Sequence, residues 1–280
     1  MGKFTGVLLA SDFDNTLLNT ETARRSGSEV PEVSPENQAA LRYFMEAGGR
    51  FAIATGRALA AFEKFADQVP MNSPGILCNG AALYDFRQHA YLDVILLDED
   101  IRSRGKAVMD AFPSVAVEAY PLENVIHAVR PNLYTRQHEH VTHVAVQEDP
   151  TLLETPYPLT KLMFEDDHDR LLEIQAHLAR QSWCRDYEIF FSDRTLLEMT
   201  ARGASKGGMV CRLAERLGIA REQVYCVGDE ANDLSMLAFA AEGFAPENCV
   251  PAVRHCGATL MPDCEHHTLA AIVAYLDKKY

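Results

Sequence analysis

Two aspartates, Asp12 and Asp14, follow a short apolar run near the start of the chain. The run covers residues 6–10, reads Gly-Val-Leu-Leu-Ala, and has the composition of a fully buried strand. A strand that ends in two acidic residues delivers them to the edge where open α/β sheets bind ligands. Because two nearby carboxylates repel each other, this pair requires a cation or a shared proton.

Three later segments carry side chains that could gather around these carboxylates. They read Ala54-Thr55-Gly56-Arg57, Ala204-Ser205-Lys206-Gly207-Gly208 and Gly228-Asp229-Glu230-Ala231-Asn232-Asp233. The first and the last follow apolar strand-like runs, and Lys206 opens a segment with apolar residues at helical spacing. Two strand ends and one helix start can therefore meet at one edge of a sheet. Their carboxylates, hydroxyl and ammonium suit a divalent cation beside a phosphoryl group.

Each of these residues also has a purely structural interpretation when it is taken singly. Asp14 could be a turn residue, Lys206 a solvated residue at a helix start, and Asp229 a helix cap. Arg57 could simply begin a helix, and Asn79 could serve a main-chain turn rather than act as a hinge or substrate contact. The functional interpretation is favoured because the segments occur together and in a fixed order.

The four segments together resemble the motifs of a known enzyme family. Asp12-Phe-Asp14-Asn-Thr16, Thr55-Gly-Arg57, Lys206 and Gly228-Asp229-Glu-Ala-Asn232-Asp233 are similar to the motifs of haloacid dehalogenase-superfamily phosphatases. The spacing, the Asn79-Gly80-Ala81 segment and the long middle insert resemble the Cof-type, class IIB branch. The resemblance implies an α/β fold with a doubly wound, Rossmann-like parallel-sheet core. Residues 1–81 and 201–280 would form this core, and residues 82–200 an inserted α+β cap.

The resemblance also implies roles for individual residues. The implied catalytic set is Asp12, Asp14, Thr55 and Lys206, with Asp12 as the nucleophile and Asp14 as the general acid and base. The implied phosphate and substrate set is Thr55, Gly56, Arg57, Asn79, Lys206 and Asn232. The implied cofactor is Mg²⁺, held by Asp12, Asp14 and Asp229. Asp233 would support these ligands without binding the ion directly. The implied reaction is hydrolysis of a phosphate monoester through an aspartyl-phosphate.

The sequence departs from the family pattern at two places. Asn15 stands where the family usually has glycine, although asparagine adopts the left-handed turn conformation more readily than other side chains do. The segment Phe244-Ala-Pro-Glu-Asn-Cys249 also differs from the usual small-residue pattern. The second departure concerns a loop behind the predicted site, so the expected chemistry is unchanged.

The composition of the 280-residue chain excludes some partners. A net charge of −14 argues against a nucleic acid, because a phosphate backbone requires a basic surface. No apolar stretch approaches the roughly 18 residues of a membrane span, and Asp12 interrupts the first apolar run too early for a signal peptide. With the resemblance, we expect a small phosphorylated metabolite as the partner of a monomer or homodimer.

Seven cysteines, an odd number scattered through the chain, favour a reducing compartment, so we expect a cytoplasmic protein. One group near the C-terminus consists of Cys249, His255, Cys256, Cys264, His266 and His267. These residue types could bind a structural zinc ion, but their spacings lack a paired Cys-x-x-Cys. Buried thiols and surface histidines are the simpler interpretation.

Apolar periodicity predicts the elements that position these residues. Helices are predicted from Pro35 toward Gly48, through Phe62 to Val69, and over residues 98–112 and 167–181, with α/β alternation resuming at Ser205. Strands are predicted at residues 6–10, 50–54, 75–78, 159–164, 187–191, 195–199 and 223–227, and near Val115 and Val125. Residues 82–85 and 91–94 are predicted to form a hairpin. This layout is typical of a core interrupted by an inserted domain.

Other functions share parts of this pattern. A phosphomutase or a glycosyl-phosphate phosphatase would use the same aspartyl-phosphate chemistry, and a non-catalytic sensor could bind metal and phosphate. The presence of both Asp12 and Asp14 argues against the sensor. A two-component receiver would be about half as long, and the sequence before Lys206 excludes a P-loop kinase.

The insert is expected to select the substrate, because a phosphate site built from strand ends leaves the rest of the substrate without contacts. From the family we expect a sugar phosphate, with nucleotide-like, flavin and pyridoxal phosphates as rivals. Residues 130–143 combine cations, hydroxyls and an aromatic residue, so Arg136 and His140 are expected to contact the substrate. The alternative for this segment is a solvated surface helix or loop.

Overall fold

The central strand forms where the sequence is apolar on both sides of the backbone. In the computed structural model, which describes residues 2–122 and 125–280, β1 spans Leu8–Ser11 and is buried throughout. Leu9 packs in one apolar cluster, whereas Leu8 and Ala10 pack in another. Because successive side chains of a strand point to opposite faces, β1 requires cover on both faces.

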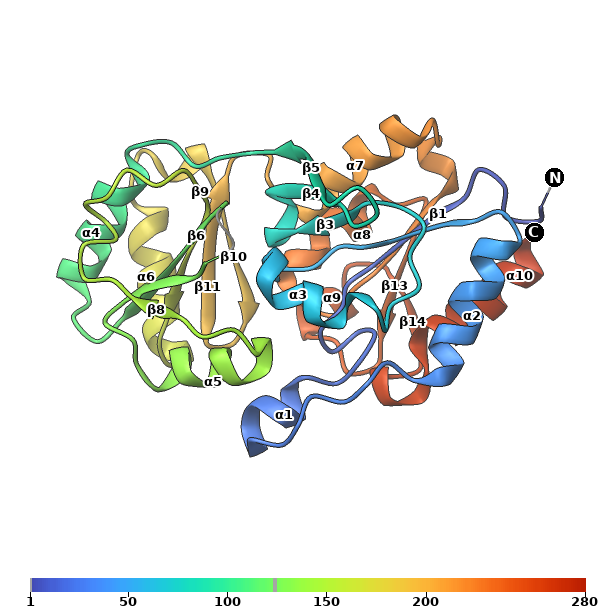
Figure 1. The fold of residues 1–280 in the computed structure, drawn as a ribbon, viewed down its shortest axis with the longest axis horizontal. Coiled ribbons are helices and arrows are strands. Elements are labelled where there is room, and N and C mark those ends of the chain that lie inside the picture. The colour runs from blue at the N-terminus through green and yellow to red at the C-terminus, as the bar shows by residue number, and fades with distance from the viewer. Residues whose placement is uncertain (1, 123–124) are drawn as a thin grey trace.

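Five parallel strands form the main sheet around β1 (Figure 1). β1 pairs with β2 (Arg50–Ile53) on one side and with β12 (Val224–Val227) on the other. β13 (Glu242–Pro246) and β14 (Thr259–Met261) extend the sheet beyond β12. The order β14-β13-β12-β1-β2 brings the carboxyl ends of β1, β2 and β12 to the edge at which parallel sheets bind ligands.

Helices cover both faces of this sheet. α2 (Pro35–Glu46), α3 (Leu59–Ala66) and α10 (Thr268–Lys279) join the apolar cluster that contains Leu9. α7 (Lys206–Leu217), α8 (Leu234–Phe239) and α9 (Pro251–Arg254) join the cluster that contains Leu8. Parallel strands with helices on both faces confirm the predicted doubly wound α/β core.

Short elements connect the strands and helices. They are α1 (Glu21–Ser26) and the 3-10 turns η1 (Cys78–Gly80), η2 (Cys184–Asp186), η3 (Arg221–Gln223), η4 (Ala231–Asp233) and η5 (Cys264–His266). Asn15 has a φ of 53°, which confirms the left-handed turn predicted there. Its side-chain oxygen accepts hydrogen bonds from the backbone N–H groups of Thr20 and Glu21, so it also anchors the start of α1.

A three-stranded antiparallel sheet lies beside the core. It consists of β3 (Gly75–Leu77), β4 (Ala82–Asp85) and β5 (Ala90–Val94), which confirms the hairpin predicted from residues 82–94. Leu83 and Tyr84 of β4 pack into the two core clusters. The domain boundary at residue 82 stays a prediction. From this packing we propose that the inserted domain begins after β5.

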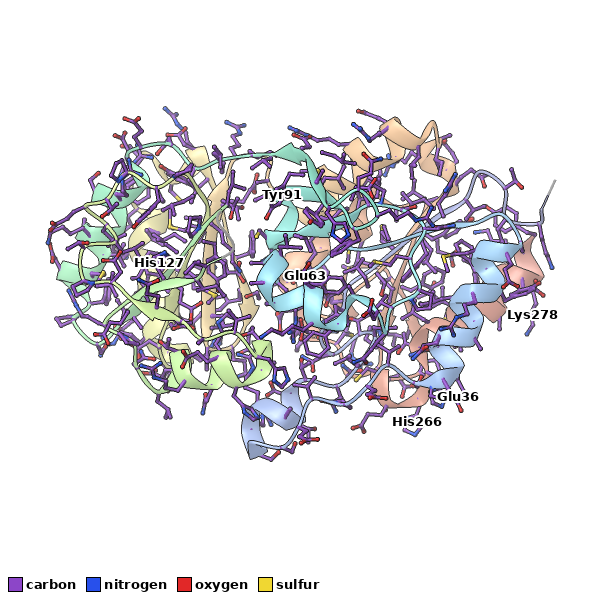
Figure 2. All side chains as sticks on the ribbon, in the orientation of Figure 1. Glu36, Glu63, Tyr91, His127, His266 and Lys278 are labelled. Carbon is purple, nitrogen blue, oxygen red and sulfur yellow. The ribbon has the colours of Figure 1, made fainter. Side chains whose placement is uncertain are left out.

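The middle of the chain forms a second sheet of six strands (Figure 1). In spatial order they are β10 (Tyr187–Asp193), β11 (Leu196–Ala201), β9 (Leu159–Glu165), β6 (Ala116–Pro121), β7 (His127–Val129) and β8 (Gln147–Glu148). α4 (Ile101–Ala111) and α6 (His168–Ala179) pack on one face through an apolar cluster. Figure 2 shows His127 within this α+β unit and Tyr91 of β5 over the core.

The other face of the second sheet is polar although it is buried. Four charged side chains on it are at most 2% exposed: Glu118, Lys161, Glu165 and Glu198. They alternate along β6, β9 and β11 with apolar residues such as Val117, Leu162 and Leu197, which meet the helices. α5 (Leu133–Thr142) lies at this face. Buried charges require partners, so this face has to meet other polar groups.

The structure also shows one predicted helix, the conformation of residues 133–142 and the state of the cysteines. The helix predicted from Pro35 is present, and its N-cap Ser34 accepts a hydrogen bond from the backbone N–H of Asn37. Residues 133–142, for which the sequence allows either a helix or a loop, form a helix. All seven cysteines are free thiols. Within residues 2–122 and 125–280, no helix is both long enough and apolar enough to cross a membrane.

The junction between η1 and α7 predicts a measurable stability difference between two glycines. Gly80 has a φ of +93°, and a Cβ there would lie 2.1 Å from the Ser205 carbonyl oxygen. Gly6 has a φ of +82° but open space around it, so it is a matched control. We expect Gly6→Ala to lower the free energy of unfolding by about 1–3 kcal/mol, and Gly80→Ala to lower it by clearly more. Urea unfolding of both variants would measure this, and equal losses would contradict the packing described.

Candidate active site

Lys206 joins two of the predicted carboxylates at the edge of the main sheet. Its ammonium donates to Asp12 Oδ1 and to Asp233 Oδ1, each at 2.6 Å. Asp12 follows β1 directly, Lys206 is the first residue of α7, and Asp233 ends η4 after β12. The three side chains are at most 7% exposed, so water screens their charges little. The fold thus brings Asp12 and Lys206 together although they lie 194 positions apart.

The loop after β12 is held by its own acidic side chains. Asp233 Oδ2 accepts hydrogen bonds from the backbone N–H groups of Asp229 and Glu230, at 2.9 and 3.0 Å. Asp229 Oδ1 accepts another from the Thr16 hydroxyl at 2.9 Å. This arrangement keeps one oxygen each of Asp12, Asp229 and Asp233 within 4.8 Å of one another.

These three carboxylates carry more negative charge than Lys206 balances. Burial and the nearby Asp233 raise the pKa of Asp12 to about 7, although Lys206 opposes the shift. Burial and Asp12 raise the pKa of Asp229 well above its ordinary value. Burial lowers the pKa of Lys206, but Asp12 and Asp233 outweigh burial, so the pKa of Lys206 is raised. A bound divalent cation would remove the repulsion, and hard carboxylate oxygens suit Mg²⁺.

Asp14, the other predicted carboxylate, is paired with Arg57. The guanidinium binds it through two bonds, Nε to Oδ2 at 2.9 Å and Nη2 to Oδ1 at 2.7 Å. Burial raises the pKa of Asp14, but Arg57 outweighs burial and lowers it to about 2. The guanidinium carbon lies 5.2 and 4.8 Å from the ring centres of Phe13 and Phe65. Because Arg57 also donates to the Val141 carbonyl of α5, it links Asp14 to the second unit.

Thr55 and Gly56 form the turn after β2. Thr55 is fully buried, and its hydroxyl accepts a hydrogen bond from the backbone N–H of Arg57 at 3.1 Å. A Cβ at Gly56 would lie 2.9 Å from Asn79 Nδ2, so the turn and Asn79 approach closely because residue 56 is glycine. The Gly56 carbonyl accepts a hydrogen bond from Lys161 of the second sheet at 2.9 Å. The turn is therefore enclosed by groups from both units.

Asn79 and Asn232 are bonded to each other at the same junction. Asn232 Nδ2 donates to Asn79 Oδ1 at 2.9 Å, and Asn79 Nδ2 donates to Glu198 Oε2 at 2.8 Å. Glu198 in turn pairs with Lys161 at 2.8 Å. Sequence reasoning did not single out Lys161 or Glu198. The signal was available, since each is a charge that interrupts an apolar strand-forming run.

One cavity lies between the core and the second sheet. Its core side includes Asp12, Asp14, Gly56, Arg57, Asp229 and Asn232. The opposite side includes Tyr120, His138, Lys161, Ser192, Asp193 and Glu198. Four predicted site residues, Thr55, Asn79, Lys206 and Asp233, do not line the cavity but bond to residues that do. The structure thus gathers all ten predicted residues at one junction.

The sequence matches a known protein family over most of its length. Residues 9–270 match the family model described as haloacid dehalogenase-like hydrolases. The chain belongs to this family. The family prediction is confirmed, and with it the expectation that the chain is an enzyme of the hydrolase type.

Individual members of the family are similar to the chain at modest identity. Pyridoxal phosphate phosphatase YbhA of Escherichia coli strain K12 is 27% identical over 270 residues, which cover 88% of this chain and 90% of the relative. The 5-amino-6-(5-phospho-D-ribitylamino)uracil phosphatase YcsE of Bacillus subtilis strain 168 is 26% identical over 254 residues, with 88% and 86% covered. A solved haloacid dehalogenase-like hydrolase from B. subtilis shares the fold, with a TM-score of 0.81 at 22% identity, and the match covers 96% of this chain and 99% of that one.

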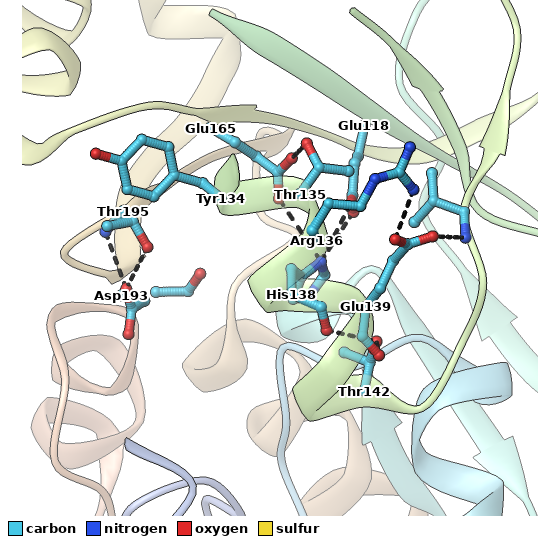
Figure 3. Close-up of polar contacts among 12 residues, drawn as sticks. Glu118, Tyr134, Thr135, Arg136, His138, Glu139, Thr142, Glu165, Asp193 and Thr195 are labelled. Carbon is cyan, nitrogen blue, oxygen red and sulfur yellow. Dashed lines mark hydrogen bonds and ion pairs between the residues drawn. The ribbon is translucent and has the colours of Figure 1, made fainter. Parts of the chain in front are cut away.

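A second group of buried ionisable side chains lies on β6, β9 and α5 of this hydrolase (Figure 3), and its His138 lines the cavity. His138 Nδ1 lies 3.0 Å from Glu118 Oε2 and 3.7 Å from Glu165 Oε1. The Tyr120 hydroxyl donates to Glu118 at 2.5 Å, and the Thr135 hydroxyl donates to Glu165. Burial and the neighbouring Glu118 raise the pKa of Glu165 well above its ordinary value. A proton on Glu165 would therefore relieve the repulsion within this group.

Arg136 and His140, which were predicted to contact the substrate, do not line the cavity in this structure. The Arg136 side chain is 56% exposed and pairs with Glu139, as Figure 3 shows. His140 Nε2 lies 2.8 Å from the carbonyl oxygen of Ser28 in the core. The residues of this segment that line the cavity are His138, Val141 and Thr142. Arg136 and His140 lie on other faces of α5, because a helix turns by about 100° per residue.

The C-terminal cysteines and histidines do not form a cluster of metal ligands in the described part of the chain. There, the groups of acidic, histidine or cysteine side chains close enough to share an ion are Asp12–Asp229–Asp233 and Glu118–His138–Glu165. His266 instead contacts Asp263, and His267 contacts the Ser34 hydroxyl. The geometry gives no support to zinc binding in this segment.

The pair of Asp14 and Arg57 predicts a large coupling free energy. We expect about 1.5–3 kcal/mol, because the hydrogen bonds are charge-assisted and Arg57 is buried. A double-mutant cycle with Asp14→Asn and Arg57→Met, followed by urea unfolding at pH 7, would measure it. The exposed pair Lys106–Asp110 is a matched control, with an expected coupling of at most about 0.5 kcal/mol.

The pH dependence of this coupling follows from the low pKa of Asp14. A group whose pKa is lowered by folding stabilises the protein above its unfolded pKa, near about 4. The coupling should therefore be constant from pH 8 to pH 5 and fall only as the pH drops toward about 2. A coupling equal to that of the control pair, or one lost between pH 8 and pH 5, would contradict this assignment.

Proposed function

We propose that this hydrolase is a Mg²⁺-dependent phosphatase that hydrolyses monoesters of small metabolites through an aspartyl-phosphate on Asp12. The observation that carries the proposal is the group of Asp12, Asp229 and Asp233 with Lys206 at the carboxyl ends of β1 and β12. Phosphoryl transfer requires an in-line nucleophile and positive charge around the transferring oxygens. This group offers a carboxylate nucleophile, an ammonium and room for a divalent cation beside one cavity.

The residues present fit Mg²⁺. The ion would be held by the carboxylates of Asp12 and Asp229 and by the main-chain carbonyl of Asp14. Asp233 would support these ligands without binding the ion directly. Burial and the neighbouring Asp12 and Asp233 raise the pKa of Asp229, and a bound cation would remove the repulsion among these carboxylates. Mg²⁺ keeps several waters, so few protein ligands suffice. When bound, the ion would neutralise charge on the carboxylates and on the phosphoryl oxygens.

The first half of the proposed reaction is attack by Asp12. An oxygen of its carboxylate forms a bond to phosphorus while the bond to the leaving oxygen breaks, which gives the aspartyl-phosphate and an alcohol. In the second half, water attacks the same phosphorus and releases Asp12 and inorganic phosphate. Lys206 and Thr55 would hold the phosphoryl oxygens, with Gly56 and Asn232 close by, so charge stabilisation is the main catalytic contribution.

Asp14 would move the protons in both halves. It would protonate the leaving oxygen first and then accept a proton from the attacking water. The bidentate bond to Arg57 favours the ionised form, which suits the second half. To act as an acid in the first half, Asp14 has to leave Arg57 and take up a proton. We therefore propose that substrate binding rearranges this ion pair.

The substrate class we propose is a sugar phosphate or a related polyol phosphate. The cavity wall opposite Asp12 offers both donors and acceptors, through Lys161, Ser192, Asp193 and Glu198. Such a mixture suits several hydroxyl groups better than a second phosphate, which would need more cations. Of the relatives described above, one is named for pyridoxal phosphate and the other for a phosphate on a ribityl chain, which is itself a polyol phosphate.

The proposal extends to domain organisation and compartment. The core formed by the two end segments would bind the phosphoryl group, and the second sheet with its helices would act as a cap that excludes water. We propose a reducing compartment, the cytoplasm, because seven free thiols are present and burial raises the pKa of thiols such as Cys226, which makes them unreactive.

Two substitutions at the β1 end test the proposed roles. Asp12→Asn should abolish turnover of p-nitrophenyl phosphate, because an amide cannot form the phosphoenzyme. Asp14→Asn should lower kcat about 10²–10⁴-fold for alkyl phosphates but much less for p-nitrophenyl phosphate, whose leaving group needs little protonation. Glu188→Gln, at a carboxylate of the second sheet away from the cavity lining, is the control. Substantial turnover by Asp12→Asn would exclude Asp12 as the nucleophile.

Product analysis separates the remaining alternatives. Release of inorganic phosphate from a panel of phosphorylated metabolites supports a phosphatase, whereas transfer of the phosphate to another position of the same sugar would indicate a phosphomutase. A wild-type protein that turns over no phosphate ester in the presence of Mg²⁺ would contradict the proposal and favour a binding role.

Metal binding can be tested without turnover. Addition of Mg²⁺ at 100 times its dissociation constant should stabilise the wild type by about 2.7 kcal/mol, because the ion binds the folded state. Differential scanning calorimetry in EDTA and in MgCl₂ would record the shift in Tm. Asp229→Asn should reduce the shift, while Asp169→Asn, at an exposed carboxylate in α6, should not change it. An identical shift in wild type and Asp229→Asn would argue against this site.

A further inference from the structure

Two hydrogen bonds in series connect the second sheet to the loop that follows β12. Glu198 on β11 accepts from Asn79 Nδ2 at 2.8 Å, and Asn79 Oδ1 accepts from Asn232 Nδ2 at 2.9 Å. The exposed fractions are 2% for Glu198, 0% for Asn79 and 8% for Asn232. The three residues come from three separate segments, so the series exists only when the second unit lies against the core.

The chemistry of Glu198 fixes the direction of both bonds. An ionised carboxylate only accepts hydrogen bonds, so Asn79 has to turn its NH₂ group toward it. The carbonyl oxygen of Asn79 then faces Asn232, which has to present its own NH₂ group. As a result Asn232 Oδ1 is left as a buried acceptor, without a hydrogen-bond partner among the described residues, at the wall of the cavity.

Lys161 keeps Glu198 in this role. Its ammonium lies 2.8 Å from Glu198 Oε2 and donates to the Gly56 carbonyl at 2.9 Å. The ammonium also lies 4.1 Å from the ring centre of Tyr120. The ion pair therefore contacts Asn79 and the Thr55-Gly56 turn at once. Both members come from the second sheet, so separation of the two units would remove both contacts together.

We propose that Glu198 and Asn79 are positioning residues that set the orientation of the Asn232 amide. With this orientation the carbonyl oxygen of Asn232, rather than its NH₂ group, faces the cavity and accepts a hydrogen bond from an O–H donor there. The donor is a hydroxyl of the leaving group or the attacking water. Closure of the second sheet onto the core completes the series of hydrogen bonds, so the orientation of the Asn232 amide depends on that closure. This inference deepens the proposed function and rests on it.

The test reverses donor and acceptor in the hydrogen bond between Asn79 and Glu198. In Asn79→Asp, two carboxylates meet where Asn79 donated to Glu198, so we expect a loss of about 10–100-fold in kcat/KM. In Glu198→Gln alone, the amide oxygen can still accept from Asn79, so the loss should be clearly smaller than in Asn79→Asp. In the double variant, the amide introduced on β11 donates to the carboxylate introduced in η1, which still accepts from Asn232. The double variant should therefore recover to within about 5-fold of wild type.

The readout separates positioning from packing and identifies the donor. All variants are assayed with p-nitrophenyl phosphate and with the best polyol phosphate, well below their measured Tm. A rise in KM for the polyol phosphate alone identifies a substrate hydroxyl as the donor, and an equal loss of kcat for both substrates identifies water. Two variants away from the cavity lining, Glu188→Gln and Asn72→Asp, make the same two types of substitution and serve as controls.

Each outcome either supports or overturns the proposal. Recovery in the double variant relative to Asn79→Asp supports the proposal. Full activity of Asn79→Asp overturns it, and so does a folded double variant that is no more active than Asn79→Asp. A wild type without phosphatase activity contradicts the proposed function instead, and an active wild type with unaffected variants contradicts only the positioning of Asn232.

Discussion

The site depends on one interaction, the buried ammonium of Lys206 between Asp12 and Asp233. Without it, two carboxylates with almost no exposure would face each other at the end of the sheet, and one of them would have to take up a proton. The ammonium ties the start of α7 to the ends of β1 and β12, so it holds three separate segments at one point. Because the ammonium neutralises only part of the negative charge of the carboxylates, an excess remains that a divalent cation can balance. The Lys206 ammonium therefore both holds the three segments together and determines the charge that the site presents to a cation.

The core could be predicted because its functional residues directly follow strong apolar runs. Asp12, Thr55 and Asp229 each stand at or just beyond the end of a buried parallel strand, and parallel strands present such ends at one edge. Asn15 was predictable for a different reason, since few side chains tolerate the left-handed turn that it occupies. In these cases a local pattern determines the position in space, and the family's motif order resolves the rest.

The junction with the second sheet could not be derived in the same way. Nothing local in the sequence pairs Asp14 with Arg57, 43 positions away, rather than with a metal or with solvent. Its charge made Arg136 a candidate for substrate contact, but the side of α5 that faces the second sheet and the core determines which residues reach the cavity. Lys161 and Glu198 were accessible in principle, because a charge within a buried strand requires a buried partner. Which partner it meets depends on how two sheets face each other, and that information is not local.

The position of β1 also constrains the order in which the chain can fold. β1 is made near residue 8, but its neighbour β12 begins only at Val224, and α10, which packs against α2, comes last. A chain leaves the ribosome from its N-terminus, so β1 waits with one edge unpaired until most of the protein has been synthesised. The second sheet lies within residues 116–201 and can form earlier. An unpaired apolar strand is a template for aggregation, so the nascent chain is most vulnerable during this interval.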